Sequence, residues 1–259
     1  MAGERIAEGW DVTEAQQRLR LVWGPDGLDK LAGSCVVVLG LGGVGSWCCE
    51  ALARDGVGTL VIVDRDEVEL SNVNRQAVAW RDTLGRAKVD VMAEMVAQVN
   101  PLATVVRRHQ FVSADNAGEL FDGLPRRPDF VVDAIDTITQ KLVVARLCQD
   151  RVYRLVSSMG GGNKVDPTRL RFMDLFDTSG DPISRVMRRE ARRRGIESLT
   201  VLCSDEPSRT PVAPEVPTPG KPGHLGTTSY LPPVMGLMLA SYVIRELVGE
   251  GVELGRASR

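Results

Sequence analysis

Residues 35–46 read CVVVLGLGGVGS, a short apolar run followed at once by a glycine-rich loop. The run is continuous and rich in β-branched residues, which is typical of a strand covered on both faces. Four glycines follow it: Gly40, Gly42, Gly43 and Gly45. They let the backbone approach a ligand, and residues 47–54, which lack Gly and Pro, can begin a helix. Because this helix would direct unpaired N–H groups and its positive dipole end at the loop, the sequence predicts a phosphate-binding site here.

The composition indicates one large globular unit with nearly balanced charge. A chain of 259 residues can bury a full core, and a net charge of −2 gives no global attraction to nucleic acid, so such a contact must come from a local patch. The five cysteines are odd in number and form no C-x-x-C pair. This pattern favours reduced thiols in a cytoplasmic protein, and it argues against a cysteine-rich zinc site. We expect no signal peptide, because the first ten residues hold acids and no apolar core region. We also expect no membrane contact, because the apolar residues 231–248 contain prolines and charges typical of a buried helix.

Apolar runs and helical spacing alternate along the first part of the chain. Strands are predicted at residues 36–39, 59–63, 103–106, 130–134 and 154–157. Residues 87–99 carry helical spacing, and residues 169–174 alternate like a further strand. The alternation implies a parallel sheet with right-handed crossovers, whose ligands bind beyond the carboxyl ends of the strands. The sequence therefore predicts an α/β fold, a Rossmann-like, doubly wound and mostly parallel sheet with a C-terminal α+β extension.

Three acids, Asp64, Asp66 and Asp136, fall at those carboxyl ends. Asp64 comes about twenty residues after the loop, where nucleotide-binding folds place the acid that accepts from the ribose. A glycine loop with one acid fits an NAD-dependent dehydrogenase equally well. The residues that follow must therefore discriminate between the two.

Three motifs make that distinction: RDEVELSNVNRQ at 65–76, LGRAKV at 84–89 and DAID at 133–136. Together they resemble the family that includes ThiF, MoeB and the ubiquitin-activating enzymes, over roughly residues 18–248. The resemblance implies a single ThiF-type adenylating domain over residues 1–259. We expect a nucleotide-binding half at 1–165 and a substrate and dimerisation half at 166–259, with a proline-rich, extended and mobile crossover at 204–223.

The resemblance implies that matching residues bind ATP and Mg²⁺, the expected cofactors. The implied nucleotide-binding set is Gly40, Gly42, Gly43, Gly45, Asp64, Asp66, Asn74, Arg75, Gln76 and Lys88. The implied catalytic set is Asp136, Arg75, Lys88 and Arg18. A triphosphate needs such cationic partners, and Asp136 would hold magnesium near the α-phosphate. Arg18 matches an arginine that the family supplies to the neighbouring subunit, which implies a homodimer, although Arg20 could be the relevant side chain.

Taken singly, these charged residues have simpler explanations. Arg75 or Lys88 could be a solvated surface charge, and Asp136 could cap the next helix. It is their joint occurrence at the family's spacing that favours the nucleotide site.

Two motifs in the second half, MGGGNKVDPTRL at 159–170 and DPISRVMRRE at 181–190, resemble the dehydratase branch of the family, which cyclises threonylcarbamoyladenosine beside the anticodon of tRNA. The implied substrate is tRNA, whose carboxylate must be adenylated before ring closure. Members that activate ubiquitin-like sulfur carriers commonly have paired C-x-x-C motifs, which this chain lacks. Some dehydratases carry a cysteine shortly before the C-terminal helix, whereas residues 223–230 read GHLGTTSY. A sulfur-relay protein remains a further candidate partner.

A basic helix is the candidate tRNA surface. Asp181 can cap a helix that begins at Pro182 and stops at Gly195. Four arginines fall on one helical face: Arg185, Arg188, Arg189 and Arg192. They would bind tRNA phosphates, although an ordinary solvated face is the alternative.

Three other functions stay open at this point. The chain could adenylate the C-terminus of a carrier protein, could act as a noncatalytic scaffold, or could be a nicotinamide dehydrogenase. Arg75, Lys88 and Asp136 argue against the last two.

Overall fold

The computed structural model describes residues 10–179, 181–212 and 225–255. The predicted crossover falls largely on residues 213–224, which lie outside the described residues.

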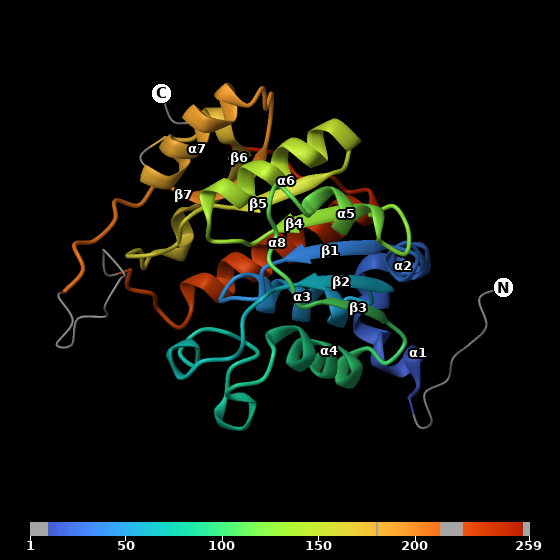
Figure 1. The fold of residues 1–259 in the computed structure, drawn as a ribbon. Coiled ribbons are helices and arrows are strands. Elements are labelled where there is room, and N and C mark those ends of the chain that lie inside the picture. Colours follow the sequence, from blue (N-terminus) through green and yellow to red (C-terminus); the bar gives the residue numbers. More distant parts are fainter. Residues whose placement is uncertain (1–9, 180, 213–224, 256–259) are drawn as a thin grey trace.

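A seven-stranded sheet forms the centre of the protein (Figure 1). Its strands are β1 (Cys35–Leu39), β2 (Thr59–Val63), β3 (Thr104–Arg108), β4 (Phe130–Asp133), β5 (Leu155–Ser158), β6 (Leu170–Asp174) and β7 (Thr200–Ser204). They lie in the order β3-β2-β1-β4-β5-β7-β6, and only β6 and β7 pair antiparallel. The chain switches direction between β1 and β4, so the predicted doubly wound, mostly parallel sheet is confirmed.

Helices cover both faces of the sheet (Figure 1). They are α1 (Val12–Ala15), α2 (Gln17–Ala32), α3 (Gly45–Arg54), α4 (Lys88–Val99), α5 (Ala117–Asp122), α6 (Ile138–Arg151), α7 (Pro182–Arg193) and α8 (Leu231–Val248). Strand β1 shows how the two layers meet, because Val36 and Val38 pack with α3, α4 and α8, whereas Val37 and Leu39 pack with α5 and α6. All five of its residues are buried, which explains the unbroken apolar run.

The structure differs from the sequence prediction mainly at short elements. Strand β3 runs two residues further than the apolar run, because Arg107 and Arg108 pair with β2 at the exposed edge of the sheet. Strand β7 was not predicted as a strand, although its Thr-Val-Leu-Cys run is apolar and buried. Helix α2 is broken at Gly24, as its Gly-Pro pair indicates.

Helix α8 is long and apolar enough to cross a membrane by length and composition alone. However, 56% of it is buried within the protein, where it packs against α3. A Cβ on Gly236 would lie 2.3 Å from the carbonyl oxygen of Val44, so this glycine lets α8 approach the first turn of α3. Core packing thus accounts for the apolarity of α8. The helix also contacts the glycine loop, where Pro232 packs against Gly43.

Cations at the amino edge of the sheet cap the C-terminal ends of three helices. Lys30 donates to the Val248 carbonyl of α8 at 2.7 Å, and Arg126 donates to the Gly33 carbonyl after α2 at 2.7 Å. Arg127 donates to the last carbonyls of α6. These cations line a groove, and their positive charges offset helix dipoles and unpaired carbonyls. Helix capping therefore explains the positive charge of this groove.

Candidate nucleotide site

The glycine loop forms a cradle of bare backbone between β1 and α3. Gly40 has a φ of 88°, and a Cβ there would lie 2.8 Å from the Ala134 carbonyl oxygen. A Cβ on Gly45 would lie 1.8 Å from the Gly40 oxygen, so no side chain fits at this position. No side chain caps the start of α3. The Ser46 and Cys48 amides donate to the Gly42 and Val44 carbonyls, each at 3.1 Å, so the Gly45 and Trp47 amides are the ones that can bind an anion at this end of α3.

Asp64 is fixed against the loop at the end of β2. One carboxylate oxygen accepts from the Leu41 amide at 2.6 Å, and the other accepts from the Asp66 amide at 2.8 Å. A carboxylate can accept about four hydrogen bonds, so both oxygens keep capacity for hydroxyl donors. The predicted ribose acid is thus buried, oriented and incompletely satisfied by the protein.

The turn that carries Asn74 and Arg75 is packed onto the same loop. A Cβ on Gly43 would lie 3.1 Å from the Arg75 Cγ, so the arginine stem crosses the glycine. The Arg75 guanidinium donates to the Ser71 carbonyl at 3.0 Å and to Asn74 Oδ1 at 2.8 Å. Trp47 of α3 donates to the Arg75 carbonyl at 2.9 Å, which holds the turn in place. Arg75 is therefore held beside the cradle and keeps further N–H groups for a ligand.

Gln76 carries an unpaired buried acceptor beside the loop. Its Oε1 is the one buried side-chain polar atom without a hydrogen-bond partner in the described part of the chain. Its Nε2 lies 3.9 Å from the position of a Cβ on Gly42. An unsatisfied buried acceptor costs about 1–3 kcal/mol. A ligand that supplies a donor would remove that cost, which fits the predicted binding role.

Lys88, at the start of α4, pairs with Asp66 and is buried. Its Nζ lies 3.1 Å from Asp66 Oδ2, and its side chain is 6% exposed, whereas that of Asp66 is 55% exposed. The alternative of a solvated lysine is therefore wrong. If the exposed Asp66 carboxylate turns toward solvent, the buried Lys88 ammonium can donate to a phosphate oxygen instead.

Asp136 lies on an exposed turn just beyond β4, and a buried ion pair fixes this turn. Lys141 Nζ lies 3.1 Å from Asp133 Oδ2, which also accepts from Ser157 Oγ at 2.6 Å. The other Asp133 oxygen accepts from the Ile135 amide at 3.1 Å. The role of Lys141 was not predicted, because a lysine on a helix is usually solvated. The backbone at Ala134, two residues before Asp136, therefore packs directly against Gly40 of the cradle.

The donor set at Asp136 fits a magnesium ion that is shared with phosphates. The described residues contain no group of three or more His, Cys, Asp and Glu side chains that could hold a metal alone. Mg²⁺ commonly binds one or two carboxylates together with substrate phosphate oxygens. Asp136 accepts only from Thr137 Oγ1, at 3.0 Å, so it retains lone pairs for this role.

Arg18 does not join these residues in its own chain. Gln16, just before it, contacts Gly56 at the C-terminal end of α3, since a Cβ on Gly56 would lie 2.7 Å from Gln16 Nε2. The glycine loop is at the other end of α3, about 15 Å away for ten residues. The exposed Arg18 side chain therefore belongs to a different surface.

Helix α7 begins as predicted, with Asp181 as its N-cap, and ends at Arg193, two residues before the predicted stop at Gly195. Arg185 and Arg189 are exposed, and Arg192 lies over the Phe176 ring. Arg188 departs from the expected free face, because it is half-buried and donates to the Thr178 carbonyl at 2.7 Å. Its packing against the turn before α7 explains the difference, and its role in RNA binding stays a prediction.

One acid partly offsets the arginines of α7. Hydrogen bonds from Arg194 and Arg189 hold the pKa of Glu190 below its usual range. Glu190 also pairs with Arg193 at 3.0 Å. The helix nevertheless keeps a net positive charge, because residues 182–193 contain five arginines and one acid.

Comparisons with known proteins agree with this geometry. The ThiF family model matches residues 14–257. The tRNA threonylcarbamoyladenosine dehydratase of Bacillus subtilis (strain 168) is 39% identical over 249 residues, which cover 92% of this chain and 96% of that protein. The SAMP-activating enzyme E1 of Haloferax volcanii is 31% identical over 236 residues, covering 89% of this chain and 73% of that protein.

A solved structure shows the same fold. The crystal structure of E. coli tRNA N6-threonylcarbamoyladenosine dehydratase, TcdA, in complex with ATP has a TM-score of 0.81 and 29% sequence identity, and the match covers 92% of this chain and 95% of that chain. The complex of TcdA with AMP has a TM-score of 0.83. With a glycine cradle of this form and a family match that extends over nearly all of its length, the protein belongs to the ThiF family.

Proposed function

We propose that this protein catalyses the ATP-dependent cyclisation of threonylcarbamoyladenosine in tRNA, beside the anticodon, with loss of water. The observation that carries the proposal is the cradle itself, a glycine loop on which Arg75 packs at Gly43 and Ala134 packs at Gly40. The buried Lys88 pairs with Asp66, whose amide donates to the Asp64 carboxylate beside the loop. The match to a dehydratase along almost the whole of both chains supports the substrate. Because tRNA is modified where it is used, we also propose a cytoplasmic location.

The reaction would proceed in two displacements. A threonyl carboxylate oxygen attacks the α-phosphorus of ATP, the bond to the β-phosphate oxygen breaks, and pyrophosphate leaves. An internal nucleophile of the same modified adenosine then attacks the carboxyl carbon and releases its proton to solvent, and AMP leaves with the original carboxylate oxygen. The sum is ring closure and hydrolysis of ATP to AMP and pyrophosphate, with no external oxidant or base consumed. Holding the carboxylate in line with phosphorus should supply most of the rate.

Each described residue would have a defined role in the first displacement. Asp64 would orient the ribose, and the loop amides would donate to the phosphate oxygens. Arg75 and Lys88 would neutralise charge on the leaving pyrophosphate. Asp136 would hold Mg²⁺, which would offset the charge that builds up around the α-phosphate.

The decisive experiment compares tRNA substrates with the purified protein. AMP and pyrophosphate should form with threonylcarbamoylated tRNA, and nucleoside mass spectrometry should show a product lighter by one water. Equal ATP consumption with unmodified tRNA would contradict the proposal.

Helix α7 would bind the tRNA backbone. Replacing Arg185 and Arg189 by glutamate should weaken tRNA binding by at least about tenfold. The slope of log Kd against log salt concentration should fall by about two, because two phosphate contacts are lost. The measurement is a binding titration at several salt concentrations. A matched control replaces Arg54 and Arg107, two exposed arginines on other elements, by glutamate. Equal losses in both variants would assign the effect to net charge and not to α7.

The active unit is proposed to be a homodimer in which Arg18 serves the neighbouring subunit. Leu21 and Val22, one turn further along α2, are 76% and 69% exposed. Two large apolar side chains beside an arginine that is remote from its own site suit an interface with a second copy. A monomeric mass by light scattering, with activity intact, would contradict this.

The chemistry is proposed to be independent of thiols. All five cysteines lie within the described residues and all are buried. Burial raises the pKa of Cys49 and of Cys148 to about 12 and that of Cys203 to about 11. No exposed thiolate is therefore present at neutral pH to form a thioester or to receive sulfur from a relay protein.

The folded enzyme should consequently retain its activity after treatment with N-ethylmaleimide at pH 7. The same treatment in guanidinium chloride should modify all five thiols, which mass spectrometry can count. Rapid inactivation of the folded enzyme together with modification of one cysteine would overturn the thiol-independent mechanism.

A second candidate function is the adenylation of a ubiquitin-like sulfur-carrier protein, favoured by the 31% identity with the SAMP-activating enzyme. It predicts pyrophosphate exchange that depends on a carrier ending in Gly-Gly. The absence of that exchange, with tRNA-dependent turnover present, would select the dehydratase.

A further inference from the structure

Residues 160–166, here termed the junction segment, connect the end of β5 to several other elements. A Cβ on Gly160 would lie 2.4 Å from Ile183 Cδ1 of α7, and one on Gly161 would lie 2.7 Å from Met235 Sδ of α8. The backbone is thus in direct contact with both helices. A segment that follows β5 leaves the same edge of the sheet as the candidate nucleotide site, because β5 pairs parallel with β4.

Asn163 ties both ends of the crossover to the junction segment. Its φ is 58°, and its carbonyl accepts from the Arg209 amide at 2.8 Å. Its Oδ1 accepts from the Gly226 amide at 2.7 Å, and its own amide donates to the Gly226 carbonyl at 2.8 Å. Asn163 is therefore hydrogen-bonded to Arg209 in the first part of the crossover and to Gly226 just after its end.

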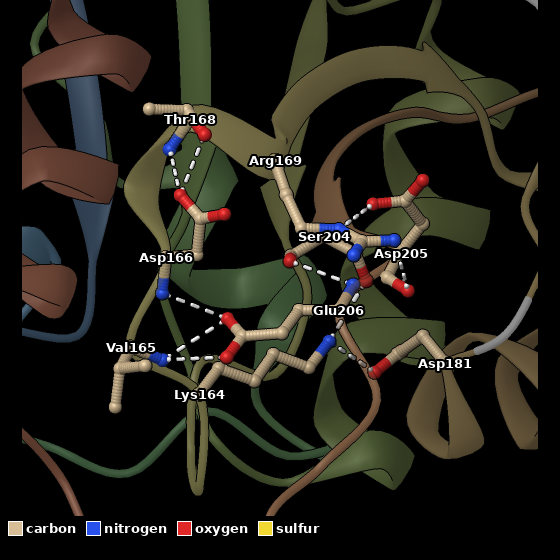
Figure 2. A network of polar contacts seen from close by, with 9 residues as sticks. All are labelled: Lys164, Val165, Asp166, Thr168, Arg169, Asp181, Ser204, Asp205 and Glu206. Carbon is tan, nitrogen blue, oxygen red and sulfur yellow. Dashed lines mark hydrogen bonds and ion pairs between the residues drawn. The ribbon is translucent and has the colours of Figure 1, made fainter.

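Lys164 lies at the centre of the junction and is buried (Figure 2). Its ammonium donates to Asp181 Oδ1 at 3.0 Å and to the Ser204 carbonyl at 2.8 Å. The Lys164 and Asp181 side chains are 1% and 3% exposed. Asp181 Oδ2 in turn accepts from the Ser184 amide at 2.7 Å, which caps α7. One ammonium group thus joins the junction segment, the first turn of α7 and the end of β7.

Glu206 completes the network from the crossover side (Figure 2). Its carboxylate accepts from the Val165 amide at 3.0 Å and from the Asp166 amide at 2.8 Å. Outside the buried part, Arg169 and Asp205 form a second pair at 2.7 Å, with side chains 42% and 50% exposed. This outer pair touches the same junction but does not reach α7, so it offers a matched control.

We propose that Lys164 is a positioning residue for the RNA substrate, which it never touches, because its ammonium fixes the arginine helix α7 relative to the edge of the sheet where the carboxylate is activated. The inference rests on the proposed function. A buried ion pair is weak evidence for stability, since well-packed neutral groups often replace one without loss. Its consequence here is geometric, because Lys164 sets the distance between phosphates bound on α7 and the nucleotide cradle.

The test must separate positioning from folding. Lys164→Met alone leaves Asp181 buried without its cation, which can unfold a protein. We therefore pair it with Asp181→Asn, because asparagine caps a helix as well as aspartate does and the double variant is neutral at both positions. The control is Arg169→Met, which removes only the outer pair.

The double variant should fold with an unchanged circular dichroism spectrum. Its KM for modified tRNA should rise by about tenfold or more, while kcat and the KM for ATP stay close to those of the parent. Amide exchange should speed up at Ser184 and Arg185, and Arg169→Met should change none of these quantities. Parent-like tRNA KM and α7 exchange in the folded double variant would overturn the proposal.

Running Arg185→Glu with Arg189→Glu in parallel keeps the two hypotheses distinguishable. If the arginine variant loses tRNA affinity and the neutral Lys164 variant does not, the positioning role fails and the proposed function stands. If neither variant loses affinity, α7 is not the tRNA surface, and the positioning role fails with it. If both lose affinity and only the Lys164 variant speeds amide exchange in α7, positioning is supported.

Discussion

Asp136→Asn is expected to lower the rate of ATP-dependent tRNA dehydration by at least about a hundredfold while the protein remains folded. The substitution keeps the size of the side chain and removes its charge, so a magnesium ion shared with the triphosphate would lose the Asp136 carboxylate. The exposed position of Asp136 means that little folding free energy is at stake. Single-turnover rates at saturating ATP, with the melting temperature of each variant, measure the effect.

Thr137→Ala serves as the control for Asp136. It removes only the hydroxyl that donates to Asp136 Oδ1 at 3.0 Å and leaves the carboxylate in place. A modest change in rate is expected from it. If Asp136→Asn retains the parent rate across a range of magnesium concentrations, Asp136 is merely a residue at the start of α6.

The main features of the fold and of the cradle were predictable because they depend on local sequence. The unbroken β1 run, the glycines and the Asp64 that ends β2 each have a direct physical meaning along the chain. Gly45 illustrates this, since only a residue without a Cβ fits against the Gly40 oxygen. A parallel sheet then follows from the alternation of strands with helices.

The unpredicted features depend on partners that are distant in sequence. The burial of Lys88 is visible only once α4 starts beside Asp66, and the pairing of Lys141 with Asp133 needs β4 and α6 to be packed together. Arg188 likewise turns toward Thr178, ten residues earlier, although its spacing places it with the exposed arginines. Periodicity locates a residue on a helix, but tertiary packing decides whether a long cationic side chain reaches solvent or a buried acceptor.

Lys88→Met is expected to reduce kcat/KM for ATP by about a hundredfold to a thousandfold. Methionine preserves the unbranched shape in a site where the lysine side chain is only 6% exposed. Asp66, left behind, is 55% exposed and stays hydrated, so the loss of the pair should cost little stability. The missing cation would instead weaken binding of the triphosphate, because the remaining methionine cannot donate to a phosphate oxygen.

Asp66→Asn distinguishes this explanation from a structural one. It removes the other half of the pair but leaves the ammonium, which no longer has to exchange a carboxylate for a phosphate oxygen when ATP binds. ATP should therefore bind this variant with a smaller loss than Lys88→Met shows, or more tightly than the parent. The measurement is kcat/KM for ATP in proteins of equal melting temperature. An equal fall in kcat/KM from both substitutions would mean that the pair orders the start of α4 and that the triphosphate is bound elsewhere.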